Sequence, residues 1–251
     1  MTPIICLERV TKSFGAQIAV HDLSLSVYPG EVVALVGQTG AGKSTVMNLI
    51  LGQIQPTSGK ITVDGCDPYA DYQALRGKVA VSFQSDRLLP WRTTRENVEL
   101  GLEILRRPKN QRKPLAEEWL NRVKLDTAHH DKYPHQLSGG MRQRVSFARA
   151  LVVDPDLVLL DESFSQLDHV TSKALRADFL ALVKELRKTC VLITHRIDDA
   201  LEMADRIIVL GSPGTIKLEL QITEAMKTDE AWLATTTRQI AAVMAAHIAS
   251  E

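Results

Sequence analysis

The eight residues Gly37–Ser44 are of the types that bind a polyphosphate. They read Gly-Gln-Thr-Gly-Ala-Gly-Lys-Ser and lie between an apolar run, Val32–Val36, and a segment of helical character, Thr45–Leu51. A glycine-rich turn between a strand and a helix lets consecutive backbone N–H groups point at an anion, next to the positive end of the helix dipole. The spacing predicts a nucleoside triphosphate site, with Lys43 reaching the β- and γ-phosphates and the Ser44 hydroxyl binding Mg²⁺.

The alternative is a tight turn that happens to spell the same pattern. A strand before the loop and a helix after it are the context that the phosphate-loop motif requires, and both are predicted here. The residues that we expect to contact the nucleotide are Gly37, Gln38, Thr39, Gly40, Ala41, Gly42, Lys43, Ser44 and Thr45.

Two adjacent carboxylates end a second apolar run. Asp161 and Glu162 directly follow Leu157–Leu160. Paired acids at the end of a buried strand are costly unless they have a partner. Beside a phosphate loop, we expect Asp161 to hold Mg²⁺, directly or through water, and Glu162 to orient and polarise the attacking water.

Two more predicted strands end in a single polar residue. Gln84 follows Lys78–Phe83, and His195 follows Cys190–Thr194. Either residue is ordinarily just a loop or structural residue. Because ligands of α/β proteins collect at the carboxyl ends of strands, we favour Gln84 as a Mg²⁺ ligand or water-positioning group and His195 as a γ-phosphate contact.

A second helix start is suited to an anion. Ser138, Gly139 and Gly140 precede the helical run Met141–Val153. Serine before a helix is commonplace capping. Paired glycines weaken a helix start unless another group must come close, so we favour a ligand here as well.

Phe14, beside Gly15, allows two interpretations. An aromatic residue at a loop tip is usually a packing residue, but it can also stack on an adenine ring. Position alone does not separate the two.

Composition excludes several classes of protein. The 251 residues carry 30 Lys and Arg against 30 Asp and Glu, so no global charge attracts nucleic acid or anionic lipid. The three cysteines lie far apart and outside any zinc or disulfide pattern, which fits a reducing cytoplasm. No apolar run approaches the length of a membrane span, so another chain must supply any spans.

The periodicity predicts an α/β core with a helical insertion. Strands are expected before and after a block of helices that occupies about residues 86–156. A basic, proline-bounded linker is expected at Arg106–Pro114 and a polar turn at Thr11–Gly15. The C-terminal tail, 226–251, is expected to pack one helical face onto the core, with a dimer or regulatory contact as the alternative. That face carries Leu233, Ile240, Val243, Met244 and Ile248.

Taken together, these segments resemble an ABC-type ATPase subunit up to about residue 225. The family's motifs occur in their usual order. They are Walker A at Gly37–Ser44, the Q-loop at Gln84, the signature at Leu137–Met141, Walker B at Leu157–Asp161 with the catalytic Glu162, the D-loop at Ser165–Asp168 and the switch histidine His195. The resemblance implies a P-loop NTPase fold with a RecA-like core, an antiparallel β part and an inserted helical subdomain, with ATP and Mg²⁺ as cofactors.

The resemblance bears on individual residues too. Phe14 falls at the family's adenine-stacking aromatic, and Asp168 at the end of the D-loop, where the resemblance implies a contact with the nucleotide. Ser163 stands where relatives commonly have proline, which implies a less rigid strand exit.

The resemblance also implies partners. Two copies pair head to tail, so that the signature helix of one caps the γ-phosphate held by the Walker A loop of the other. Leu88–Val98 resembles the segment with which nitrate, sulfonate and taurine importer ATPases contact a membrane permease. A subunit at the cytoplasmic face of the inner membrane is implied, served indirectly by a periplasmic or lipoprotein solute-binding protein and binding no nucleic acid.

Three rival functions are open. The first is an ABC ATPase acting on DNA or the ribosome, although no long coiled-coil insertion or second ATPase unit is visible. The second is a small-molecule kinase, which leaves Leu137–Met141 without a role. The third is an exporter or lipid-trafficking ATPase of the same family.

Overall fold

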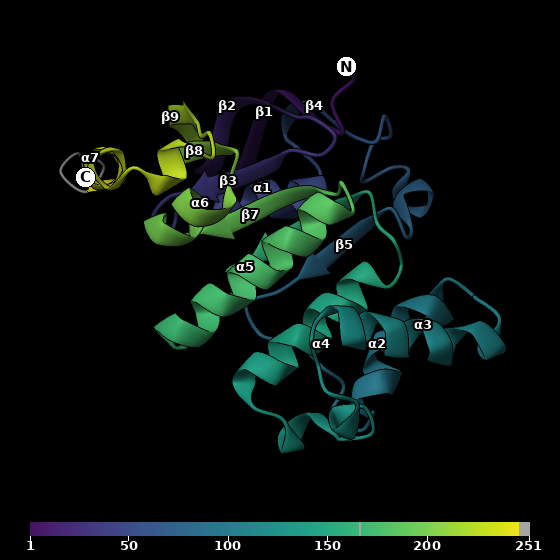
Figure 1. Ribbon diagram of the computed structural model, residues 1–251. Helices are drawn as coiled ribbons and strands as arrows, with labels where there is room; N and C mark the ends of the chain where they lie inside the picture. Colours follow the sequence, from purple (N-terminus) through teal and green to yellow (C-terminus); the bar gives the residue numbers. More distant parts are fainter. Residues whose placement is uncertain (166, 246–251) are drawn as a thin grey trace. The chain divides into compact units, whose positions relative to one another are not determined.

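The computed structural model describes residues 1–165 and 167–245, which form two compact units. The first unit contains Met1–Leu75 and the chain from Thr189 onward, and the second contains Arg76–Lys188. Figure 1 labels most of the helices and strands of both. Each unit is described by itself.

An antiparallel sheet opens the first unit. Its order is β2-β1-β4, made by β1 (Ile5–Phe14), β2 (Gln17–Val27) and β4 (Ser58–Val63). The expected turn at Thr11–Gly15 is wrong, because β1 continues to Phe14, which pairs with Gln17. Register shifts after Leu7 interrupt the alternation of buried and exposed residues, so the sequence pattern stops at Val10 while the pairing continues.

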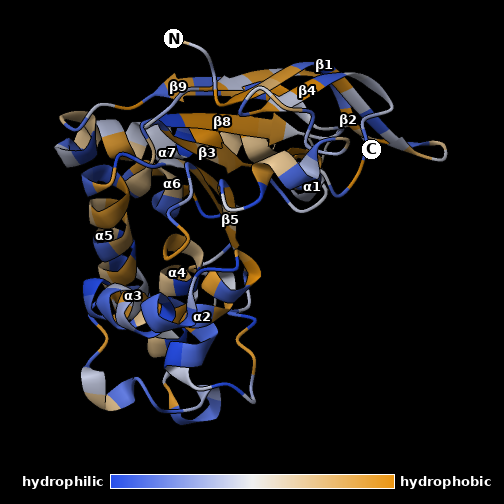
Figure 2. Cartoon of the chain, turned by 90° about the vertical axis from the view of Figure 1, so that its right-hand side faces the viewer, coloured by the Kyte–Doolittle hydropathy of each residue, from blue (hydrophilic) through white to orange (hydrophobic). Residues whose placement is uncertain are grey.

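The second sheet of the first unit holds the phosphate-loop strand. Its order is β7-β3-β8-β9, from β7 (Thr189–Thr194), β3 (Val32–Val36), β8 (Arg206–Gly211) and β9 (Thr215–Gln221). β3 is parallel to both of its neighbours, and β9 is antiparallel to β8. All residues of β3, β7 and β8 are buried, which explains their nearly continuous apolar sequences. Figure 2 shows β3 and β8 in hydrophobic colours.

Three α-helices accompany these sheets in the described part of the first unit. They are α1 (Lys43–Ile50), α6 (Ile197–Met203) and α7 (Glu230–Ala245). The short α6 was not expected. α7 packs against α6, β8 and β9 and buries Ile240, as the core-packing interpretation of the tail predicts. Ile248, which we placed on the same face, lies outside the described residues.

The second unit combines two parallel strands with four α-helices among its described residues. β5 (Val79–Ser82) pairs with β6 (Leu157–Asp161). The helices are α2 (Thr94–Ile104), α3 (Lys109–Arg122), α4 (Gly139–Leu151) and α5 (His169–Glu185). Phe147 of α4 packs on Phe164 and on Phe179 of α5, with ring centroids 5.5 and 4.6 Å apart.

The expected linker at Arg106–Pro114 is wrong over its second half. α3 begins at Lys109 and carries Pro114 inside it, so the second half of the expected linker is helical. Pro114 lies beyond the first turn and removes one hydrogen bond of the helix, but the helix continues on both sides of it. Arg112 Nε also donates to the carbonyl oxygen of Arg107 at 2.8 Å, which ties the new helix to the residues before it.

None of the helices described here combines the length and the apolar character needed to cross a membrane.

Candidate nucleotide site

The phosphate loop is a backbone turn that excludes side chains at two of its glycines. A Cβ at Gly37 would lie 2.7 Å from the Leu210 carbonyl oxygen, and one at Gly42 would lie 2.5 Å from the Ala19 carbonyl oxygen. Gly42 also has a φ of 84°, in the left-handed region that favours glycine. These two contacts lock the loop between β8 and β2 and leave its backbone N–H groups to face a ligand.

The lysine of the loop, Lys43, is the first residue of α1, so this helix starts with a positive charge. Gly42 is the N-cap of α1, and no side chain among the described residues caps this helix start. Lys43 Nζ donates to the carbonyl oxygens of Gly37 and Gln38 at 2.6 and 2.7 Å. The ammonium group therefore lies on the loop that we expect to hold the phosphates. Ser44, exposed, and Thr45, half-buried, occupy the first turn of the helix.

His195 leaves the sheet beside the phosphate loop. Val36 of β3 pairs with Thr194 of β7, so Gly37 and His195 follow neighbouring strands at the same level. The His195 side chain is exposed. Within the first unit, the structure thus brings together two groups that we expected at one edge of the sheet.

Phe14 ends β1 with its side chain half-exposed. Its relative exposure is 51%, and Lys12 Nζ lies 5.0 Å from its ring centroid. This exposure disfavours a core-packing role and leaves one ring face for a planar ligand. The stacking role stays a prediction.

The second unit gathers the groups that we expect to act on the γ-phosphate. Ser82 of β5 pairs with Leu160 of β6, so Gln84 and the pair Asp161 and Glu162 leave neighbouring strands at one edge. Gln84 Nε2 donates to Ser165 Oγ at 3.5 Å. Glu162 has a φ of 46°, which is rare for a residue with a Cβ.

The signature segment begins α4. Ser138 is its N-cap, and Ser138 Oγ accepts from the Met141 N–H at 3.3 Å. A Cβ at Gly140 would lie 2.9 Å from the Thr171 methyl group, and one at Gly139 would lie 3.3 Å from Leu167. The close approach that we assigned to a ligand is thus made by side chains of this chain, and a ligand at this helix start stays a prediction.

Asp168 caps α5. Its Oδ1 accepts from the Thr171 N–H at 3.0 Å, and this backbone hydrogen bond lowers the pKa of the carboxyl group. The capping role accounts for an acid at this position, while its expected contact with nucleotide stays a prediction. Gln166 of the expected D-loop lies outside the described residues.

Two arginines of α4 bind the residues that follow Gln84, a connection that we did not expect from the sequence. We call this connection the clamp. Arg142 Nε pairs with Asp86 Oδ2 at 2.9 Å, and Arg149 donates to the carbonyl oxygens of Asp86 and Arg87. Arg142 and Arg149 are seven residues apart, which places them on one helical face and was the available signal. The clamp makes Asp86–Arg87 move with α4.

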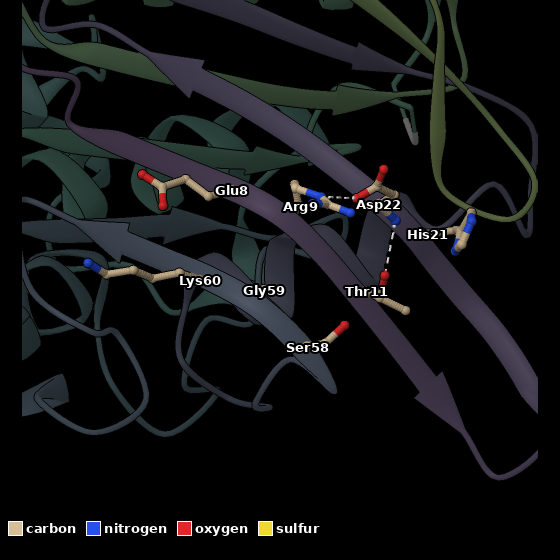
Figure 3. Close-up of a pocket in the computed structure, with 8 residues that line it drawn as sticks. All are labelled: Glu8, Arg9, Thr11, His21, Asp22, Ser58, Gly59 and Lys60. Carbon is tan, nitrogen blue, oxygen red and sulfur yellow. Dashed lines mark hydrogen bonds and ion pairs between the residues drawn. The ribbon is translucent and has the colours of Figure 1, made fainter.

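A polar hollow of about 740 Å³ lies elsewhere, on the antiparallel sheet. Figure 3 shows its lining, which consists of Glu8, Arg9, Thr11, His21, Asp22, Ser58, Gly59 and Lys60. Arg9 Nε pairs with Asp22 Oδ1 at 3.1 Å, and both side chains are largely exposed. The lining carries both signs of charge and contains none of the expected nucleotide ligands, so we do not assign it to the nucleotide.

The residues present fit ATP and Mg²⁺ by their chemistry. The phosphate loop supplies backbone donors and an ammonium group, as a polyphosphate requires. No cluster of three His, Cys, Asp or Glu residues exists in the part of the chain that the structure describes. Mg²⁺ commonly takes one or two protein oxygens together with phosphates and water, and oxygens of this kind are present on Ser44 in the first unit and on Asp161 and Gln84 in the second.

Comparison with known proteins decides the family. Residues 20–165 match the ABC transporter family. The chain belongs to that family. Its fold is the family's P-loop NTPase fold with an antiparallel β part and a helical part, as the resemblance predicted.

Three similar proteins place it further within the family. The nitrate import ATP-binding protein NrtD of Synechococcus elongatus is 40% identical over 229 residues, which cover 88% of this chain and 82% of the relative. The choline transport ATP-binding protein OpuBA of Bacillus subtilis is 39% identical over 82% of this chain, which spans only 55% of that relative. A dimeric structure of the ATP-binding cassette MJ0796 bound to ADP and Pi matches with a TM-score of 0.77 and 33% identity, covering 87% of this chain and 99% of that one.

Proposed function

We propose that this chain is the ATP-hydrolysing subunit of a solute importer. The observation that best supports this function is the start of α1, which has no side-chain cap. There Lys43 and the glycines of the loop form an anion site inside an ABC-family fold. The edge formed by Gln84, Asp161 and Glu162 supplies the acid and amide groups that hydrolysis needs.

Each residue has a stated role in the proposed reaction. MgATP supplies the reactive γ-phosphoryl group and the cation that offsets its charge. Lys43 and the loop N–H groups neutralise the phosphates, and Phe14 stacks on the adenine. Glu162 orients the attacking water, and His195 stabilises charge that develops on the γ-phosphate. Gln84 and Asp161 hold the metal ion with Ser44.

A second copy completes the site in this proposal. Ser138, Gly139 and Gly140 begin a helix whose N-terminus has only one capping side-chain bond among the described residues. Backbone N–H groups at such a start favour an anion, and α1 already provides one start for the triphosphate. In a head-to-tail pair of copies, the α1 start of one copy and the α4 start of the other both face the triphosphate. Asp168 lies near the boundary between the copies. The dimeric MJ0796 structure supports this arrangement.

A membrane permease is the proposed mechanical partner. The side chain of Asn97 is fully buried and holds the segment Leu89–Thr93: Oδ1 accepts from the Leu89 N–H, and the two hydrogens of Nδ2 are shared among the carbonyl oxygens of Leu89, Arg92 and Thr93. Trp91, at the centre of this segment, is 72% exposed. A large aromatic residue displayed on a rigid loop is typical of a protein interface. The proposed location is therefore peripheral, at the cytoplasmic face of the inner membrane.

The proposed solute is a small anion, zwitterion or quaternary ammonium cation, brought by a periplasmic or lipoprotein binding protein. NrtD is named for nitrate and OpuBA for choline, and both are about equally similar to this chain. The earlier preference for nitrate, sulfonate or taurine is therefore widened to include osmolytes such as choline. Exporter, lipid-trafficking and non-transport ABC ATPases remain the alternatives, and the kinase alternative is disfavoured by the family match.

Two substitutions test the proposed reaction. We expect Glu162→Gln to bind ATP as the unaltered chain does but to lose at least about a hundredfold in kcat, because only the water-activating group is removed. We expect Lys43→Ala to lose ATP binding as well. Equilibrium ATP binding and phosphate release are measured on both. Phosphate release by the Glu162 variant at the normal rate would contradict the role of this residue.

A further inference from the structure

Ser163 and Ser82 form a buried connection between the exits of β6 and β5. Ser163 directly follows Glu162, and Ser82 is the last residue of β5. Ser163 is only 2% exposed. Its Oγ donates to the carbonyl oxygen of Ser82 at 2.8 Å, which is a good hydrogen bond for a hydroxyl donor. The residue after the carboxylate is thereby anchored to the neighbouring strand.

The carbonyl group of Glu162 itself is anchored too. Both the N–H and the Oγ of Ser165 donate to the carbonyl oxygen of Glu162, at 3.0 and 2.8 Å. Glu162 itself has a φ of 46°, a conformation that a residue with a Cβ keeps only when its surroundings hold it. The pairing of β6 with β5 holds the backbone before Glu162, and the bonds of Ser163 and Ser165 hold the backbone after it. Since φ sets the direction of the Cα–Cβ bond, these constraints limit where the Glu162 side chain points.

The Ser82 hydroxyl extends the connection to α4. Gln143 Nε2 donates to Ser82 Oγ at 3.3 Å, and Ser146 Oγ lies 3.3 Å from the same atom. Ser82, Gln143 and Ser146 are all buried. These two contacts involve the Ser82 hydroxyl, whereas Ser163 binds the Ser82 carbonyl oxygen.

We propose that Ser163 is a positioning residue for ATP hydrolysis. Its hydroxyl holds the left-handed turn at Glu162 in one conformation and so keeps the carboxylate directed at the attacking water. Where relatives commonly have proline, the ring would restrict the backbone but could donate no hydrogen bond. In this chain a hydrogen bond to β5 provides the constraint. The inference rests on the proposed role of Glu162.

Ser146 offers a matched control for the test. Ser163→Ala and Ser146→Ala each remove one buried hydroxyl near Ser82, but the Ser146 hydroxyl lies next to the Ser82 side chain, whereas the Ser163 hydroxyl binds the Ser82 backbone. We expect Ser163→Ala to lower kcat at least about tenfold with KM for ATP within about twofold, because a misdirected base slows chemistry and leaves the phosphate loop intact. Ser146→Ala is expected to keep kcat, and Ser163→Thr, which restores the hydroxyl, is expected to recover it.

A double-substitution cycle separates positioning from packing. If Ser163 acts through Glu162, adding Ser163→Ala to Glu162→Gln should lower kcat no further. Thermal unfolding is measured on every variant, and Ser163→Cys, which keeps the volume but donates weakly, replaces the alanine variant should that one fail to fold. Equal losses of kcat for Ser163→Ala and Ser146→Ala, an unchanged kcat for Ser163→Ala, or additive losses in the cycle would overturn the proposal.

The failure of this inference is distinguishable from failure of the proposed function. If Glu162→Gln is inactive while Ser163→Ala is fully active, only the positioning role fails. If Glu162→Gln hydrolyses ATP normally, the proposed function fails first.

Discussion

The environment of Lys43 suits this residue to bind a phosphate. It is 6% exposed, and an ammonium group buried to this extent needs oxygen partners. Carbonyl oxygens of its own loop provide two of them. The loop therefore keeps a positive charge in place at the start of α1, where it can neutralise a phosphate.

The ring of Phe14 is expected to contribute to the affinity for ATP. We expect Phe14→Ala to weaken ATP binding about tenfold, because stacking of one base on an aromatic ring is worth roughly 1–3 kcal/mol. Phe14→Tyr keeps the ring and should bind ATP normally. Affinities for ATP and for inorganic tripolyphosphate are compared by calorimetry. A loss of tripolyphosphate binding in Phe14→Ala would show that the substitution damages the phosphate loop rather than the adenine contact.

Among the elements, α5 forms ion pairs with the helical part of the second unit through one carboxylate, that of Asp178. Asp178 of α5 pairs with Lys124 at 2.6 Å and with Arg144 of α4 at 2.8 Å. Burial alone would raise the pKa of Asp178, but the hydrogen bonds and charges of Lys124 and Arg144 outweigh it and hold the pKa below its ordinary value.

This lowered pKa predicts a pH dependence of stability. A carboxyl group whose pKa is lower in the folded state contributes stability above its unfolded pKa, about 3.9, and loses it as the pH falls through the folded pKa. We expect Asp178→Asn to lower the free energy of unfolding by about 1–2 kcal/mol at pH 7. Denaturant unfolding at several pH values should show this difference shrinking below about pH 4. A difference that is independent of pH would mean that the charge of Asp178 does not matter.

The segment Leu89–Thr93, which Asn97 holds, is the proposed contact with the membrane permease. We expect Trp91→Ala to reduce co-purification with the proposed membrane permease, because a central aromatic residue often dominates an interface. Tyr72→Ala is the matched control, since Tyr72 is also exposed but lies in the first unit. Equal recovery of the membrane subunit with Trp91→Ala and the unaltered chain would exclude this loop as the contact.

For the whole molecule, the head-to-tail pair predicts a specific cross-link. One copy carries Ser138→Cys, a tagged second copy carries Thr39→Cys, and both carry Glu162→Gln to preserve ATP. Cys6 and Cys66 are changed to serine. Cys190 can stay, because burial raises the pKa of its thiol to about 12 and leaves it unreactive near neutral pH.

We expect a short bis-maleimide to join the two copies in the presence of MgATP and much less with MgADP. Denaturing gels read the product. Tyr72→Cys in place of Ser138→Cys serves as the control for random collision. If the Ser138 and Tyr72 variants cross-link equally, the two copies do not pair in the proposed way.

Local sequence was sufficient to predict most of the elements and the candidate residues. The phosphate loop, the apolar strands and the polar residues at their ends follow from composition and periodicity within short windows, because such windows contain the whole signal. The grouping of Gly37 with His195 in the first unit, and of Gln84 with Asp161 and Glu162 in the second, could be anticipated since parallel strands end at the same side of a sheet.

Only the tertiary structure decided the remainder. The continuation of β1 to Phe14 depends on pairing with β2 across register shifts, and the glycines after Ser138 are explained by Thr171 and Leu167. The tie from Ser163 to Ser82 joins residues 81 positions apart, so no local pattern predicts it. A hydrogen bond or a close contact depends on which distant residue arrives nearby, and that is a property of the folded chain alone.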